Sequence, residues 1–235
     1  MLGSFLRGKR HMGRGYIIIV SLSACIMLYI LEQVIGTDYA TKTAAKVILF
    51  TAAPYVYFKI VKRESLKDSL RLIKLKGSPY KLELLLGAVS FTGVFGAYFL
   101  LVGYIDFDVI LKELRVRSQI DASSYVLIGM YIIFGNSFIE ELFFRGFVFL
   151  SLFKKGYRKL AYVYSSVLFG IYHIAMLNTW ISPLLLGLSV AGLTIVGLVF
   201  DWLDSRSGNI INSWIVHMLA DCALIIIGMS MFNLI

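Results

Sequence analysis

The chain is divided into long apolar stretches, and this division leaves few folds open to it. A helix needs about 20 predominantly apolar residues to cross a bilayer, and we identify seven such stretches in the sequence. They cover approximately residues 16–36, 43–61, 82–105, 124–152, 160–177, 181–200 and 211–233. Charged residues make up only 16% of the chain, against about 25% in a soluble domain. We therefore predict an all-α, polytopic helical bundle in a membrane, with an active site inside the bundle.

The connections between the stretches are too short for a separate soluble domain. We expect residues 1–15 to form a basic cytoplasmic N-terminus and residues 16–235 to form a single transmembrane domain. The first stretch is too long for the apolar part of a cleaved signal peptide, and further stretches follow it. We therefore expect it to remain as the first membrane span.

Lysine and arginine gather in alternate connections, which predicts how the bundle is oriented. The N-terminus and the connections 62–81 and 154–159 are rich in basic residues, whereas 37–42 holds one and 178–182 none. The positive-inside rule then places the N-terminus in the cytoplasm and the C-terminus outside. The net charge of +9 is explained by topology and by contact with the lipid bilayer, so we expect no nucleic-acid partner.

Two connections are long enough to hold structure of their own. In 62–81 the spacing of Leu66, Leu70 and Ile73 among basic residues fits an amphipathic helix on the inner leaflet, and it fits a solvated linker equally well. In 106–123 we expect a short helix on the outer face.

The fourth stretch carries charges that are costly in a bilayer unless they have a neutralising partner or a functional role. Glu140, Glu141 and Arg145 interrupt an otherwise nearly uncharged run. Each charge at the bilayer centre costs about 2.5–3.5 kcal/mol on insertion scales. Glu141 and Arg145 are four residues apart and share a helix face, so we predict a structural ion pair between them. Glu140 is rotated about 100° away and remains free for chemistry.

Two later stretches place polar residues at a matching depth. The fifth contains Phe169-x-x-x-His173 and the seventh contains His217-x-x-x-Asp221. At a rise of about 1.5 Å per residue, Glu140 and His173 lie roughly 18 and 20 Å from the inner ends of their helices, and His217 lies roughly 9–18 Å. We therefore expect these side chains to meet, with Glu140 as the working carboxylate and Asp221 placed to orient His217.

These motifs, Glu-Glu-x-x-x-Arg, Phe-x-x-x-His and His-x-x-x-Asn/Asp in successive stretches, resemble the CPBP family of intramembrane proteases. That family includes the type II CAAX prenyl endopeptidases and the bacterial Abi proteins linked to bacteriocin self-immunity. The motifs cover residues 140–221 within a family core of about 124–233, and 207–210 (Ser-Gly-Asn-Ile) is also similar. Glu141, Arg145 and Phe169 belong to the motifs and are expected to support the site.

The resemblance implies an intramembrane endopeptidase whose site opens towards the cytoplasm. Carried over by position, Glu140 is the base that activates water, and His173 holds that water or a metal ion. His217 and the residue at 221 stabilise the oxyanion or complete a ligand set. Prenyl endopeptidases typically carry Asn where this chain has Asp221, and an ionised Asp cannot donate to an oxyanion. A divalent metal such as zinc, bound by Glu140, His173, His217 and Asp221, is therefore an equal alternative.

Two classes of function stay open. The first is an endopeptidase acting on a membrane peptide or lipidated protein, such as a peptide precursor, a pheromone, a bacteriocin or a CAAX-like protein, in a bacterial cell membrane. The second is a non-catalytic scaffold or immunity protein that binds a sensor kinase or a bacteriocin receptor. An inert scaffold need not keep Glu140, His173 and His217 together, so the sequence favours catalysis. A proton-coupled transporter is disfavoured because the sequence has no inverted repeat.

Overall fold

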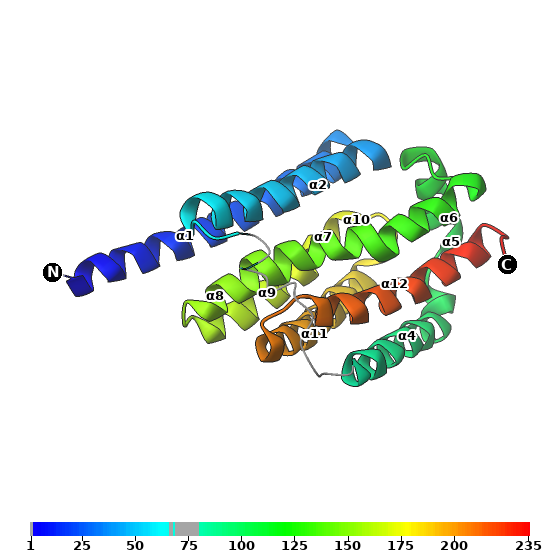
Figure 1. Cartoon of the computed structure of the whole chain (residues 1–235). Helices are drawn as coiled ribbons and strands as arrows, with labels where there is room; N and C mark the ends of the chain where they lie inside the picture. Colours follow the sequence, from blue (N-terminus) through cyan, green and yellow to red (C-terminus); the bar gives the residue numbers. More distant parts are fainter. Residues whose placement is uncertain (1, 66–67, 69–79) are drawn as a thin grey trace.

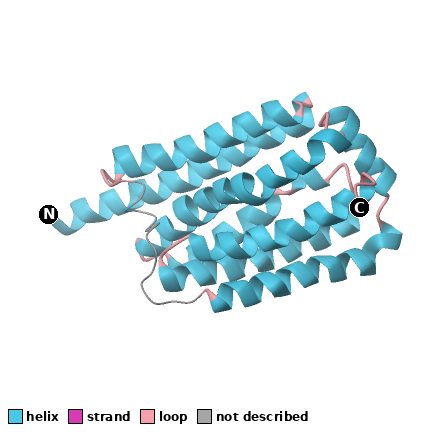
Figure 2. Cartoon of the chain, turned by 45° about the vertical axis from the view of Figure 1, so that its right-hand side comes forward, coloured by secondary structure: helices cyan, strands magenta, loops and turns pink. Residues whose placement is uncertain are grey.

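The computed structural model describes residues 2–65, 68 and 80–235, with side chains from residue 13 onward. The described chain is a bundle of helices without strands (Figure 2). Seven helical segments are long and apolar enough to cross a membrane, which confirms the predicted polytopic all-α class. They are Gly13–Ile35, Tyr39–Val61, Lys81–Tyr104, Ala122–Lys154, Arg158–Leu177, Pro183–Ser207 and Ile211–Met231.

Several of these segments join α-helical to π-helical geometry. The first three spans comprise α1 (Leu2–Tyr29) with η1 (Ile30–Ile35), α2 (Tyr39–Val56) with η2 (Tyr57–Val61), and α4 (Lys81–Leu101) with the 3-10 turn η3 (Val102–Tyr104). The fourth comprises α6 (Ala122–Tyr131), η5 (Ile132–Asn136), α7 (Ser137–Glu141), η6 (Leu142–Phe149) and α8 (Leu150–Lys154). The last three comprise α9 (Arg158–Tyr172) with α10 (Ile174–Leu177), α11 (Pro183–Ser207) and α12 (Ile211–Met231).

The fourth span runs through the middle of the bundle (Figure 1). Its η6 segment contacts α2 and α9, while α7 contacts α12. Every side chain of η6 is buried. Aromatic rings fill much of this centre, and Phe50 of α2 stacks on Phe143 of η6 with ring centroids 3.9 Å apart. The polar residues of this span are therefore enclosed by other helices rather than by lipid.

Close helix contacts fix the fifth and sixth spans to each other. Gly170 of α9 lies directly against α11, because a Cβ atom there would come within 2.8 Å of the carbonyl oxygen of Val190. Beside α11, α4 packs along α12 (Figure 1). The histidine-bearing spans are thus each held by a neighbouring helix that itself contributes no predicted site residue.

Side-chain caps define where several helices begin. Asp121 accepts hydrogen bonds from the Ser123 hydroxyl (2.7 Å) and from the backbone N–H of Ser124 (2.9 Å), ahead of α6. These hydrogen bonds lower the pKa of Asp121 to about 2. Ser182 accepts from the N–H of Leu185 at the start of α11, and Pro183 stands at its first turn, where no backbone donor is needed.

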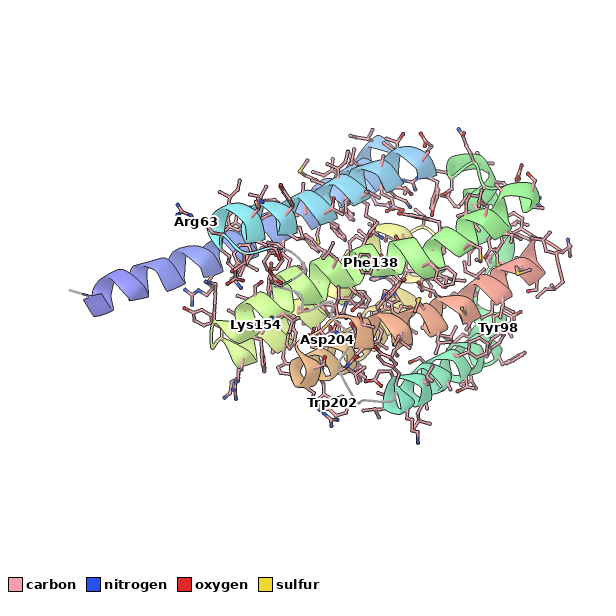
Figure 3. The ribbon with its side chains drawn as sticks, viewed as in Figure 1. Arg63, Tyr98, Phe138, Lys154, Trp202 and Asp204 are labelled. Atoms are coloured by element: carbon pink, nitrogen blue, oxygen red, sulfur yellow. The ribbon has the colours of Figure 1, made fainter. Side chains whose placement is uncertain are left out.

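The positions of the two chain ends are consistent with an odd number of spans. The N- and C-termini lie at opposite ends of the bundle (Figure 1). Arg63 and Lys154, from two basic connections, lie at the end from which α1 starts (Figure 3). These two basic residues therefore share one end of the bundle, as the alternation of charge predicts, and the N-in orientation remains a prediction.

The predictions for the two long connections have different outcomes. The third contains the predicted short helix, α5 (Phe107–Lys112), followed by the π-helical turn η4 (Glu113–Arg117). The predicted amphipathic helix in 62–81 rests on apolar positions that lie outside the described residues.

The predicted end of the sixth span was wrong. We expected the helix to end near residue 200, but α11 continues to Ser207 and ends at Gly208, whose φ of 66° is a left-handed conformation that suits glycine. Asp201 and Asp204, which lie in this added part of the helix, are fully buried. Figure 3 shows Asp204 within the bundle and Trp202, which is 42% exposed, on its outside.

Candidate active site

The structure brings the four principal candidates together from three spans. The Oε2 atom of Glu140 lies 3.9 Å from Nε2 of His173 and 3.8 Å from Nε2 of His217. Nε2 of His217 also lies 3.7 Å from Oδ2 of Asp221. These distances are too long for direct hydrogen bonds. They suit a water molecule that bonds to two of the atoms at once.

A break in the fifth span sets the orientation of His173. The backbone N–H of His173 bonds to the carbonyl of Gly170, so the helix changes pitch between α9 and α10. The carbonyl oxygen of Phe169 instead accepts a hydrogen bond from Nδ1 of His173, at 2.7 Å. A carbonyl can only accept, so Nδ1 carries the hydrogen and Nε2 faces Glu140. The ring of Phe169 also packs edge-on against His173 and His217.

His217 is oriented by Glu141. Nδ1 of His217 lies 2.8 Å from Oε1 of Glu141, so its hydrogen points to that carboxylate and Nε2 points to the site. We expected Asp221 to orient His217, but Asp221 lies on the Nε2 side of the ring. Oδ2 of Asp221 has no hydrogen-bond partner among the described residues and is buried. Three carboxylates therefore surround one imidazole and can balance the charge of an imidazolium.

Arg145 pairs with Glu141 as the four-residue spacing predicts. Its Nη1 atom lies 3.3 Å from Oε1 of Glu141, and both side chains are completely buried. The guanidinium lies between the rings of Phe169 and Phe200, 4.1 and 4.9 Å from their centroids. Its Nε atom lies 3.6 Å from Asp201. Glu141 thus connects this buried arginine to His217.

Lys46 belongs to the site, although it lies outside the three sequence motifs. This residue of α2 is buried, and its ammonium group forms an ion pair with Oε1 of Glu140. It also donates to Oδ1 of Asn136 at 2.5 Å, while Nδ2 of Asn136 lies 3.2 Å from Oε1 of Glu140. The sequence feature that could have indicated its role is a charged residue inside the second apolar stretch.

Two aspartates of α11 also contact residues near the site. They were not predicted because the predicted sixth span ended before them. Asp201 accepts a hydrogen bond from the Ser165 hydroxyl at 3.1 Å. Asp204 accepts from the hydroxyl of Ser213 at 2.9 Å and from its backbone N–H at 3.3 Å, in the first turn of α12. A carboxylate at a helix N-terminus satisfies free backbone donors and favours the helix dipole. Asp204 therefore fixes the start of the helix that carries His217.

The donor set does not form a metal site in this conformation. Among the side chains of residues 13–65, 68 and 80–235, no three His, Cys, Asp or Glu residues form a group that could hold a metal ion. The ammonium of Lys46 pairs with Oε1 of Glu140, and Oε2 is the oxygen that faces the two histidines. The predicted zinc site of Glu140, His173, His217 and Asp221 therefore remains a prediction.

The fold and the site together define an integral, multi-pass membrane protein with a polar glutamate–histidine centre enclosed by its helices. Comparison with known families gives the narrower assignment. Residues 122–223 match the family model described as type II CAAX prenyl endopeptidase, Rce1-like. This match supports the assignment of the chain to the CPBP/CAAX protease family. The matched residues include all three motifs on which the resemblance was based. No curated protein and no solved structure matches the chain.

Proposed function

We propose that the chain is a CAAX-type intramembrane endopeptidase in which Glu140 activates the attacking water. The family match supports this class of enzyme in general. The observation that carries the proposal is the position of Oε2 of Glu140, which faces two imidazole Nε2 atoms at 3.8 and 3.9 Å. A buried carboxylate beside two oriented imidazoles is suited to proton transfer in a site from which bulk water is excluded.

The chemistry follows from these orientations. A water molecule donates one hydrogen bond to Oε2 of Glu140 and one to Nε2 of His173. Glu140 takes a proton as the water oxygen bonds to the peptide carbonyl carbon, and the carbonyl oxygen becomes an oxyanion. A protonated His217, held through Nδ1 by Glu141, donates its Nε2–H to that oxyanion. Glu140 then gives its proton to the amide nitrogen, the C–N bond breaks and the carbonyl re-forms.

Asp221 has a different role in this scheme from an asparagine at the same position. An ionised carboxylate cannot donate to an oxyanion. Its Oδ2 atom lies 3.7 Å from Nε2 of His217, where it balances the imidazolium charge. We assign oxyanion donation to His217 and charge balance to Asp221 together with Glu141.

The location of the site limits the substrate. A centre enclosed by membrane-crossing helices suits a peptide that is itself membrane-associated: a peptide precursor, a pheromone, a bacteriocin or a CAAX-like lipidated protein. We further propose a bacterial cell membrane location with the N-terminus in the cytoplasm. The gathering of Arg63 and Lys154 at the end from which α1 starts supports this orientation under the positive-inside rule.

Quantitative peptidomics of cells expressing the wild type or Glu140→Gln at equal abundance tests the function. The expected result is a precursor that accumulates, and a product that disappears, only with Glu140→Gln. Lys42→Met is the matched control, because it removes an ion pair with Glu32 outside the site. Identical peptide pools, with Glu140→Gln still rescuing a deletion phenotype, would instead favour a scaffold that binds a sensor kinase or a bacteriocin receptor.

A further inference from the structure

The first turn of α12 is bonded to two other spans just before the helix reaches His217. Ser213 lies four residues before His217 and Trp214 lies three, so both are within about one helical turn of it. Ser213 contacts α11, and the indole of Trp214 contacts the fourth span. Neighbouring residues of a helix point in directions about 100° apart. The two contacts therefore hold α12 from different sides.

The contact with α11 supplies partners that the start of a helix lacks. The first backbone N–H groups of a helix have no acceptor within it, and an unpaired N–H is costly inside a membrane. Asp204 accepts from the backbone N–H of Ser213 at 3.3 Å and from its hydroxyl at 2.9 Å. Asn209, ahead of the helix, accepts from the N–H of Ile211 at 3.0 Å. Because Asp204 and Ser213 are completely buried, this contact ties α12 to α11 at one defined height.

The contact with the fourth span lies beside the motif glutamates. The indole N–H of Trp214 donates to Oγ of Ser137 at 3.0 Å. The hydroxyl of Ser137 itself donates to the carbonyl of Ile133, so this oxygen is held in place. The ring of Trp214 also packs edge-on against Phe138, with ring centroids 5.2 Å apart. Ser137 lies four residues before Glu141, which is the partner of the histidine in α12.

We infer that Asp204 and Trp214 are positioning residues that set the height and rotation of α12 and so hold His217 against Glu141. A helix that slips by one residue moves by about 1.5 Å along its axis and turns by about 100°. Nδ1 of His217 lies 2.8 Å from Oε1 of Glu141, so such a slip breaks this hydrogen bond. It also moves Nε2 of the same ring away from Glu140, which it faces at 3.8 Å.

The catalytic meaning of this inference rests on the proposed function, but the placement of His217 can be measured without a substrate. A ring N–H that is buried and hydrogen-bonded gives a proton resonance at low field. We would record it by nuclear magnetic resonance on the full chain in lipid, with isotope-labelled histidine and at one fixed pH. The chain has three histidines, and His217→Gln identifies the resonance that belongs to the contact with Glu141.

Two variants break the contacts of the first turn separately. Asp204→Leu removes both acceptors of Ser213, and Trp214→Phe keeps a ring but has no N–H donor. We expect each to shift the resonance or abolish it. Asp204→Asn should retain the resonance, because its oxygen can accept from the N–H of Ser213 and its amide can donate to the hydroxyl. Asp121→Leu is the matched control, since it removes the cap of α6 and should leave the resonance unchanged.

Each outcome decides the role of one residue. An unchanged resonance in folded Asp204→Leu or in folded Trp214→Phe would overturn the positioning role of the residue replaced. The same loss in Asp204→Asn, or in Asp121→Leu, would overturn a role that depends on this particular contact. If Asp204→Leu does not fold, Trp214→Phe and Asp204→Asn still decide the question, because they preserve most of the packing.

The same variants give a catalytic readout on the peptide that depends on Glu140. We expect Asp204→Leu to lower kcat by about 100-fold with KM unchanged, because a displacement of about 1 Å has an effect of that size. Asp204→Asn should restore kcat and Asp121→Leu should retain it, each measured per folded molecule. Wild-type kcat in Asp204→Leu would overturn the inference. If no peptide depends on Glu140, the proposed function fails, and the resonance still decides whether these residues position His217.

Discussion

The Nδ1 atom of His217 lies 2.8 Å from the Oε1 atom of Glu141, although the two residues belong to spans at opposite ends of the matched region. Oε1 of Glu141 also receives Nη1 of Arg145 at 3.3 Å. The second glutamate of the motif therefore connects a structural ion pair to a histidine of the site. The Glu-Glu pair divides its tasks, with Glu140 facing the reacting water and Glu141 facing the group that stabilises the oxyanion.

Replacing Glu141 by glutamine tests this division. Glutamine can still accept a hydrogen bond from Nδ1 of His217, but it cannot balance an imidazolium charge. We expect kcat for the Glu140-dependent peptide to fall by about 100-fold or more, as expected for a group that orients a catalytic histidine. The rate should be measured per folded molecule, with Glu141→Gln/Arg145→Met as a charge-balanced control. Full activity of Glu141→Gln would show that the charge of Glu141 is not needed beside His217.

Removing the guanidinium of Arg145 tests the buried ion pair. We expect Arg145→Met to lower stability by about 3–5 kcal/mol, because Glu141 and Asp201 lose their buried cation. Thermal unfolding in detergent measures the change. Arg117→Met is the matched control, since Arg117 forms a pair of the same spacing with Glu113, at 3.6 Å, with both side chains partly exposed. The control should change stability by less than about 1 kcal/mol, and equal losses would contradict a special role for burial.

Removal of metal ions tests the choice of water activation. Because water activation by Glu140, as proposed, needs no metal ion, we expect chelators to leave proteolysis unchanged. Membranes treated with a strong chelator and then washed should process the Glu140-dependent peptide at the untreated rate. Loss of processing that zinc restores would establish instead the metal set of Glu140, His173, His217 and Asp221.

The cap at Asp121 predicts how stability depends on acid. Its pKa is lowered to about 2 in the folded chain from an ordinary value of 3.8, so the carboxylate contributes stability above the higher value. This contribution is lost as the pH falls through about 2. Asp121→Asn keeps a capping oxygen but does not titrate, so its melting temperature should decline less steeply over this range. Parallel curves for the two proteins would show that the cap does not form.

The sequence predicted the spans well because lipid imposes a strong and local requirement for apolar residues. The end of α11 was missed because Asp201 and Asp204 look like surface residues when they are considered alone. Their partners, Ser165 and Ser213, lie in other spans, and one sequence does not show such pairings. Whether a polar residue in the middle of a membrane helix has a partner can be recognised only when the packing of the helices is known.

The principal members of the site were predicted, but Lys46 and some of the contacts between the side chains were not. Equal depth and shared helix faces brought Glu140, His173 and His217 together correctly in space. The break at His173, which frees the carbonyl of Phe169 for its Nδ1 atom, depends on a local change of helix pitch that the four-residue spacing does not reveal. Lys46 was missed because it lies in another span, far from the motifs in sequence.

The burial of Arg145 between two later helices constrains how the protein can be made. Spans enter the bilayer in order of synthesis, yet Asp201 and the ring of Phe200, both contacts of this guanidinium, lie two spans further along the chain. Until that helix arrives, Glu141 is the nearer group that can neutralise the arginine. The pocket around Arg145 is therefore complete only when the sixth span has packed against the fourth.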